Sequence, residues 1–110
     1  MVERISRSRV RETSVSTGTG NITLAGAAGS DLAFATVMAV NDTADVFFGT
    51  ATQWEVSHCK LASTGPTVLQ RLAVIENSSN NTSFINFSGG TLDVWMDGPG
   101  QRQGLSLIHI

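Results

Sequence analysis

Turn-forming residues recur along the chain at intervals of about 8–12 residues, and this spacing constrains the fold more than any other feature of the sequence. Glycine, asparagine and proline mark turns at Gly18-Thr19-Gly20, Asn41-Asp42-Thr43, Gly65-Pro66 and Ser88-Gly89-Gly90. The segments between these turns are rich in β-branched and aromatic residues, which pack well on a pleated sheet. The sequence therefore predicts an all-β fold, either an antiparallel β-sandwich or a barrel-like module.

Residues 12–26 show the pattern most clearly. We expect strands at residues 12–17 and 20–26, separated at Gly18-Thr19-Gly20 because glycine adopts backbone angles that other residues resist. Ile22 and Leu24 fall on the same face of the second strand, as in a half-buried strand. This run carries no acid, base or nucleophile arranged for chemistry, so its expected role is to build a sheet.

The remaining strands are predicted from similar runs between turns. Residues 33–40 are apolar throughout, so a short helical turn near residues 31–39 and a buried strand both stay open there. Further strands are expected at residues 44–48, 53–57 and 67–76, the last with a kink near Arg71, and a closing hairpin at residues 84–87 and 91–96.

Trp54 is expected to dominate the stability of the domain. It shares a face with Val56 on a predicted strand. Burying an indole is worth roughly 4–6 kcal/mol, a large part of the stability of a small domain. The sequence therefore predicts that loss of Trp54 alone would unfold the protein.

The 110 residues are enough for one domain with a single core. Residues 1–11 contain few apolar side chains and are expected to form an extended N-terminal arm. Residues 12–98 form the predicted β-sandwich domain. Residues 99–110 change character and form a C-terminal tail, whose apolar end is either a strand for a neighbour's sheet or an artefact of how the reading frame was delimited and foreign to the domain.

The charge of the chain is small but unevenly distributed. The net charge is −2, which gives no overall attraction to nucleic acid or to an anionic membrane. Residues 1–12 carry four arginines and two glutamates, whereas the rest of the chain is acidic. We therefore expect the arm to dock on an acidic neighbour, with its partner-binding residues being Arg4, Arg7, Arg9 and Arg11.

Cysteine and hydropathy limit the cellular context. Cys59 is the single cysteine, so no internal disulfide is expected and a reducing site of synthesis fits. The N-terminal residues lack an apolar segment after their arginines, and no window approaches the ~18 apolar residues of a membrane span. The sequence predicts a soluble protein made in the cytoplasm.

Residue types with catalytic or metal-binding potential are few and scattered. His58 and Cys59 are neighbours on a predicted strand and should point to opposite faces, so His58 is not expected to activate Cys59. The acidic residues Asp42, Asp45 and Asp93 adjoin turns, where aspartate commonly makes local hydrogen bonds. We expect no catalytic residue, no metal site and no cofactor.

Four blocks of the sequence, taken in order, resemble a module that recurs in virion proteins of tailed bacteriophages. The family pattern begins with "RVKETTTTTGTG-x-TLAGA", continues with "WEVG-x-GTYT", and ends with "R-x-TVLASSN…FSAGTK-x-V". The corresponding blocks are Arg9 to Ala27, Trp54-Glu55-Val56, Leu69 to Asn80 and Asn86 to Val94. The chain departs from the pattern at Ser57, at His58-Cys59-Lys60-Leu61, and from Arg102 to Ile110, which has no counterpart.

The resemblance implies a non-enzymatic structural component of a tailed-phage virion, of the tail-fibre, baseplate or head-decoration type. Its partners would be other virion proteins and copies of itself, with a homotrimer as the expected assembly and the virion as its location. The alternative is a carbohydrate-binding adhesion module at a fibre tip that contacts a host surface glycan. For that alternative the candidate residues are Phe87, Trp95 and the 77–83 loop.

Overall fold

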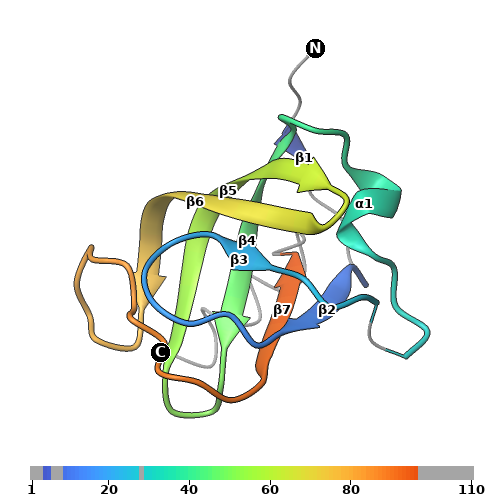
Figure 1. The fold of residues 1–110 in the computed structure, drawn as a ribbon. Coiled ribbons are helices and arrows are strands. Elements are labelled where there is room, and N and C mark those ends of the chain that lie inside the picture. Colours follow the sequence, from blue (N-terminus) through green and yellow to red (C-terminus); the bar gives the residue numbers. More distant parts are fainter. Residues whose placement is uncertain (1–3, 6–8, 28, 97–110) are drawn as a thin grey trace.

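The computed structural model describes residues 4–5, 9–27 and 29–96, and the strands in this part of the chain form one nearly closed sheet (Figure 1). The order along the sheet is β2-β7-β4-β5-β6-β3, with β1 pairing separately with β4. The predicted all-β, barrel-like fold is confirmed. The elements are β1 Arg4–Ile5, β2 Arg11–Ser14, β3 Ile22–Thr23, α1 Phe34–Val37, β4 Thr43–Gly49, β5 Trp54–Thr64, β6 Thr67–Asn77 and β7 Leu92–Met96.

An antiparallel meander of β4, β5 and β6 forms the largest part of the sheet. Phe47 of β4 lies opposite Val56 of β5, and Leu61 of β5 lies opposite Leu69 of β6. The β5–β6 register shifts between His58 and Cys59, next to the predicted kink at Arg71. Such irregularities bend a strand and increase its twist, which helps the sheet to curl.

The edge of β4 is shared by two strands. β7 pairs antiparallel with Val46–Gly49, and β1 pairs parallel with Thr43 and Ala44, just beyond the end of β7. On its other side β7 pairs with β2, so that the N-terminal and C-terminal parts of the described chain lie side by side (Figure 1).

The first and last strands of the order, β2 and β3, approach each other and nearly close the barrel. Ala25 N–H donates to the Thr13 carbonyl over 2.8 Å, and the Ser14 hydroxyl donates to the Thr23 carbonyl over 2.6 Å. Both strands are shorter than predicted. The hydroxyl of Ser16 accepts a hydrogen bond from Thr23 N–H, and such side-chain bonds compete with a regular ladder.

The core fills the inside of the barrel with alternate residues of each strand. Along β4, Val46 and Phe48 point inward while Phe47 faces outward, and on β7 Leu92, Val94 and Met96 point inward, as predicted. The core cluster contains Val10, Ile22, Leu24, Phe34, Met38, Ala44, Val46, Phe48, Cys59, Leu61, Leu69, Ile85, Phe87, Leu92, Val94 and Met96.

A single helical turn, α1, covers one end of the barrel, so the open choice between helix and strand near residues 31–39 falls to the helix. Phe34 at its start is fully buried. The buried carboxylate of Glu12 accepts hydrogen bonds from Phe34 N–H over 2.8 Å and from Gly26 N–H over 2.9 Å. Glu12 therefore ties the helical turn and the Gly26 turn to β2.

The first strand of the predicted closing hairpin is wrong. Residues 84–87 form no strand, and their one ladder contact is the bridge between Phe87 and Gly18. The reason is a competing set of bonds: Ile85 N–H donates to the Glu55 carboxylate, and the Ile85 carbonyl accepts from Arg71. Buried side chains thus take the backbone groups that β7 would have bonded.

Trp54 does not belong to the core. It lies half-buried at the start of β5, on the outward face, with its ring stacked 6.1 Å from that of Phe47. The expectation that Trp54 dominates stability is therefore wrong, because the face that it shares with Val56 is the outer one. Inside the barrel, Phe48 and Phe87 contact each other edge to face.

Candidate functional site

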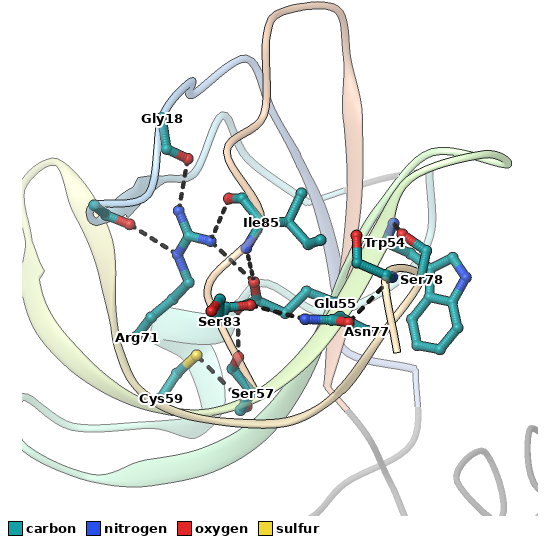
Figure 2. Close-up of polar contacts among 12 residues, drawn as sticks. Gly18, Trp54, Glu55, Ser57, Cys59, Arg71, Asn77, Ser78, Ser83 and Ile85 are labelled. Carbon is teal, nitrogen blue, oxygen red and sulfur yellow. Dashed lines mark hydrogen bonds and ion pairs between the residues drawn. The ribbon is translucent and has the colours of Figure 1, made fainter. Parts of the chain in front are cut away.

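The most elaborate polar cluster of the described chain is built around Arg71, inside the barrel (Figure 2). Arg71 Nε donates to the Gly20 carbonyl and Nη2 to the Gly18 carbonyl, both over 2.9 Å. Nη1 donates to the Ile85 carbonyl over 3.0 Å and to Glu55 Oε1 over 3.2 Å. One side chain on β6 therefore joins the 18–20 turn, β5 and the 84–87 segment.

Glu55, the partner of Arg71, is completely buried on β5. Its Oε1 accepts from Ile85 N–H over 2.6 Å as well as from Arg71, and its Oε2 accepts from the Ser57 hydroxyl. A buried carboxylate is tolerated when it is paired and its lone pairs are bonded, as they are here. We call Arg71, Glu55 and their bonded neighbours Gly18, Gly20, Ser57 and Ile85 the arginine cluster.

Aromatic rings enclose the guanidinium group of Arg71. Its central carbon lies 5.3 Å from the ring centroids of Phe48 and Phe84 and 5.7 Å from that of Phe87. These distances allow cation–π attraction, which is stronger in a desolvated site than at the surface. The arrangement uses most of the hydrogen-bonding capacity of Arg71 and Glu55 inside the protein, so the arginine cluster acts as a brace between segments.

The predicted partner-binding arginines have different surroundings. Arg9 forms an exposed ion pair with Asp31, and Arg11 forms a half-exposed one with Asp93, each at under 3 Å. The hydrogen bond from Asp93 and its charge raise the pKa of Arg11. The backbone of Arg4 lies in β1, and Arg7 lies outside the described residues.

Val10, within the predicted arm of residues 1–11, is buried in the core, and β2 begins at Arg11. Arg9 precedes them in a left-handed backbone conformation with a φ of 65°. The last residues of the predicted arm are therefore packed into the barrel. The predicted tail, residues 99–110, lies outside the described residues.

His58 and Cys59 point to opposite faces of β5, as predicted. His58 Nδ1 lies 2.9 Å from Asp45 Oδ1 on the outer face. Cys59 is buried in the core, where its thiol contacts the Ser57 carbonyl. Burial, with the nearby Glu55 carboxylate, raises the pKa of Cys59, and the Arg71 charge offsets this only in part.

The carboxylates that adjoin turns make local contacts, in line with the expectation for such residues. Asp42 Oδ2 accepts from Ala39 N–H over 2.9 Å, Asp45 pairs with His58, and Asp93 pairs with Arg11. Within residues 4–5, 9–27 and 29–96, no group of three or more His, Cys, Asp or Glu side chains is close enough to hold a metal ion.

The three candidates for carbohydrate contact separate clearly. Phe87 is only 2% exposed and belongs to the core, which removes it from any surface role. Trp95 faces outward but is stacked on Phe47, with ring centroids 3.9 Å apart. The 77–83 loop projects from the side of the barrel and, with the end of β6, lines a shallow open pocket of about 230 Å³ (Figure 1).

Sequence reasoning missed the arginine cluster. The available signals were weak: Arg71 interrupts an apolar run, and Glu55 stands between Trp54 and Val56 on a predicted strand. A charged residue at an inward position of a strand indicates a buried pair. The partners, however, are carbonyls of the 18–20 turn and of Ile85, and these can be identified only once the chain is folded.

Among the described residues, no helix has the length and apolar character needed to cross a lipid bilayer. Comparison of the chain with protein-family models, with curated proteins and with solved structures finds no match.

Proposed function

We propose that the protein is a non-enzymatic structural component of a tailed-phage virion, which acts by assembling with copies of itself and with other virion proteins. The tail fibre, the baseplate and the head decoration are the candidate locations, and a homotrimer is the proposed assembly. The proposal starts from the four ordered sequence blocks that resemble a phage virion module.

The observation that carries this proposal is where the blocks meet. Gly18 and Gly20 come from the first block, Glu55 from the second, Arg71 from the third and Phe87 from the fourth, and all five contact one another through the arginine cluster. The residues that carry the resemblance are therefore largely those that brace the barrel. A shared pattern of this kind is what a shared scaffold requires, which supports a structural role.

The N-terminal region supplies a second line of support. It is basic in an otherwise acidic chain, and β1 attaches to the sheet through only two residue pairs, Arg4 with Thr43 and Ile5 with Ala44. A short edge strand of this kind can also pair with another chain. In the proposed assembly the arm therefore contributes contacts between neighbouring copies.

The proposal is tested by measuring the mass of the purified protein with light scattering over a range of concentrations. We expect about three times the mass of one chain. A variant that lacks residues 1–8 keeps Val10 and β2, so it should remain folded by circular dichroism and lose the trimer.

Arg9→Ala is the matched control for this truncation, because it removes a charge of the region but leaves β1 in place. It should keep the trimer. A full-length protein that is monomeric at every concentration would contradict the proposed assembly. A trimer that survives the truncation would show that the arm is not part of the interface.

A further inference from the structure

We propose that the pocket beside the 77–83 loop binds a neutral saccharide, a site independent of the proposed assembly. The pocket lies between the end of β6 and the loop that follows it and has a volume of about 230 Å³. It is lined by Ile75, Glu76, Asn77, Asn80, Asn81 and Thr82. Five polar residues and one exposed apolar residue thus surround a small open hollow.

The loop is held in shape by Asn77, whose side chain is fully used inside the protein. Its Nδ2 donates to Asn81 Oδ1 over 3.0 Å and to the Ser83 carbonyl over 2.7 Å. Its Oδ1 accepts from Ser79 N–H and Asn81 N–H, both over 3.1 Å. All four hydrogen-bonding positions of the amide are occupied, so Asn77 fixes the pocket and leaves ligand contacts to its neighbours.

The loop is also fastened to the barrel. Ser78 and Trp54 exchange two hydrogen bonds, from Trp54 N–H to the Ser78 hydroxyl over 3.1 Å and from Ser78 N–H to the Trp54 carbonyl over 2.9 Å (Figure 2). A pocket whose walls are fixed in advance loses less conformational entropy on binding. Asn77 and Ser78 therefore preorganise a surface that would otherwise be a flexible polar loop.

Several polar groups around the pocket have no hydrogen-bond partner in the described part of the chain. They are the side chains of Glu76, Asn80 and Thr82 and the Nδ2 group of Asn81, whose Oδ1 accepts from Asn77 and Ser83. This set combines amide donors and acceptors, a hydroxyl and a carboxylate. Sugar hydroxyl groups both donate and accept, so they match such a mixed set.

Charge and size narrow the ligand to an uncharged one of about one sugar ring. Glu76 is the one ionisable side chain that lines the pocket, so an anion would be repelled. A single carboxylate is also a poor metal site. The volume falls below the ~300–1,000 Å³ of pockets for drug-sized molecules. Exposed Ile75 offers an apolar surface for the carbon face of the ring.

The experiment is an NMR titration of the isotope-labelled full chain with glucose, galactose, mannose and N-acetylglucosamine, each at millimolar concentrations. At least one sugar should shift the amide signals of residues 75–82 in a saturable manner. The double variant Asn80→Gly/Thr82→Val removes two ligand groups and keeps a residue that tolerates the φ of 56° at position 80. It should weaken binding by about tenfold or more.

The control variant is Ser79→Ala, because Ser79 lies in the same loop but does not line the pocket. It should bind as the parent protein does. The proposal is overturned if no sugar shifts these signals, or if the double variant binds as tightly as the parent. Saturable shifts with inorganic phosphate or calcium in place of sugar would likewise overturn it, since they would assign the pocket to an ion.

Discussion

Arg71 and Glu55 show how a weakly charged protein can place two charges in its interior. Removing an ion pair from water carries a desolvation penalty of several kcal/mol per ion, which only good geometry and further hydrogen bonds can offset. Both conditions hold here, because carbonyls of Gly18, Gly20 and Ile85 take up the remaining donors of Arg71. The pair is thus a device for fixing loops as much as a source of stability.

At the residue scale, Arg71→Met should destabilise the protein severely. The change leaves the Glu55 charge buried without its cation and leaves three carbonyls without a donor, for an expected loss of about 3–5 kcal/mol in the free energy of unfolding. Urea denaturation followed by circular dichroism measures this loss.

The control for Arg71→Met is Arg11→Ala, which breaks the half-exposed pair with Asp93 and should cost less than about 1 kcal/mol. The double variant Glu55→Leu/Arg71→Met should lose less than the sum of its single changes, because no buried charge is left behind. Equal losses for Arg71→Met and Arg11→Ala would contradict the role given to the arginine cluster.

At the element scale, the turn between β4 and β5 depends on Gly49. A Cβ atom at this position would lie 2.5 Å from the Gln53 carbonyl oxygen and 2.5 Å from the Trp54 Cα. Both are backbone atoms, which cannot turn aside as the end of a flexible side chain can. The close approach of the two strands at Gly49 therefore requires a residue without a side chain.

Gly49→Ala should destabilise the β4–β5 turn by about 1–3 kcal/mol, the usual cost of overpacking. A domain of this size should then melt roughly 4–8 °C lower for each kcal/mol lost. Gly20→Ala is the matched control, because a Cβ there meets nothing within 4 Å and the carbonyl that bonds Arg71 is kept. Differential scanning calorimetry of both variants tests the prediction, and a similar melting temperature for the two would contradict it.

At the scale of the whole molecule, the barrel protects Cys59, and this links its stability to alkaline pH. Burial raises the pKa of Cys59 in the folded protein, whereas in the unfolded chain the thiol ionises near its ordinary pKa of about 8.5. Above that pH the unfolded state has lost a proton that the folded state keeps. Unfolding then releases a proton, so stability falls as pH rises.

The expected slope from this thiol is at most about 1.4 kcal/mol per pH unit above pH ~8.5, and it is absent at lower pH. Urea denaturation of the protein between neutral and alkaline pH measures it. Cys59→Ala lowers stability at every pH by removing buried volume, but it should show a shallower alkaline decline than the parent. Identical declines in the two proteins would show that the folded thiol ionises as the unfolded one does.

Much of the fold follows from local chemistry and could be predicted. The turns at Gly65-Pro66 and Asn41-Asp42 lie between the strands they were expected to separate, and Leu92, Val94 and Met96 alternate into the core. Local periodicity could not decide which side of a strand would face inward. Trp54 and Val56 do share a face, yet that face is outside the barrel, because sheet curvature assigns the inner side to Glu55 and Ser57.

The sequence by itself determined a turn-punctuated, weakly charged β protein, since turn residues and alternation act over a few neighbouring positions. The tertiary structure alone decided which distant groups would meet. Arg71 reaches turn carbonyls more than fifty positions before it, and its bond to Ile85 helps to keep residues 84–87 from pairing as a strand. Burial makes such pairings necessary, because polar groups taken from water must find partners wherever the closed barrel places them.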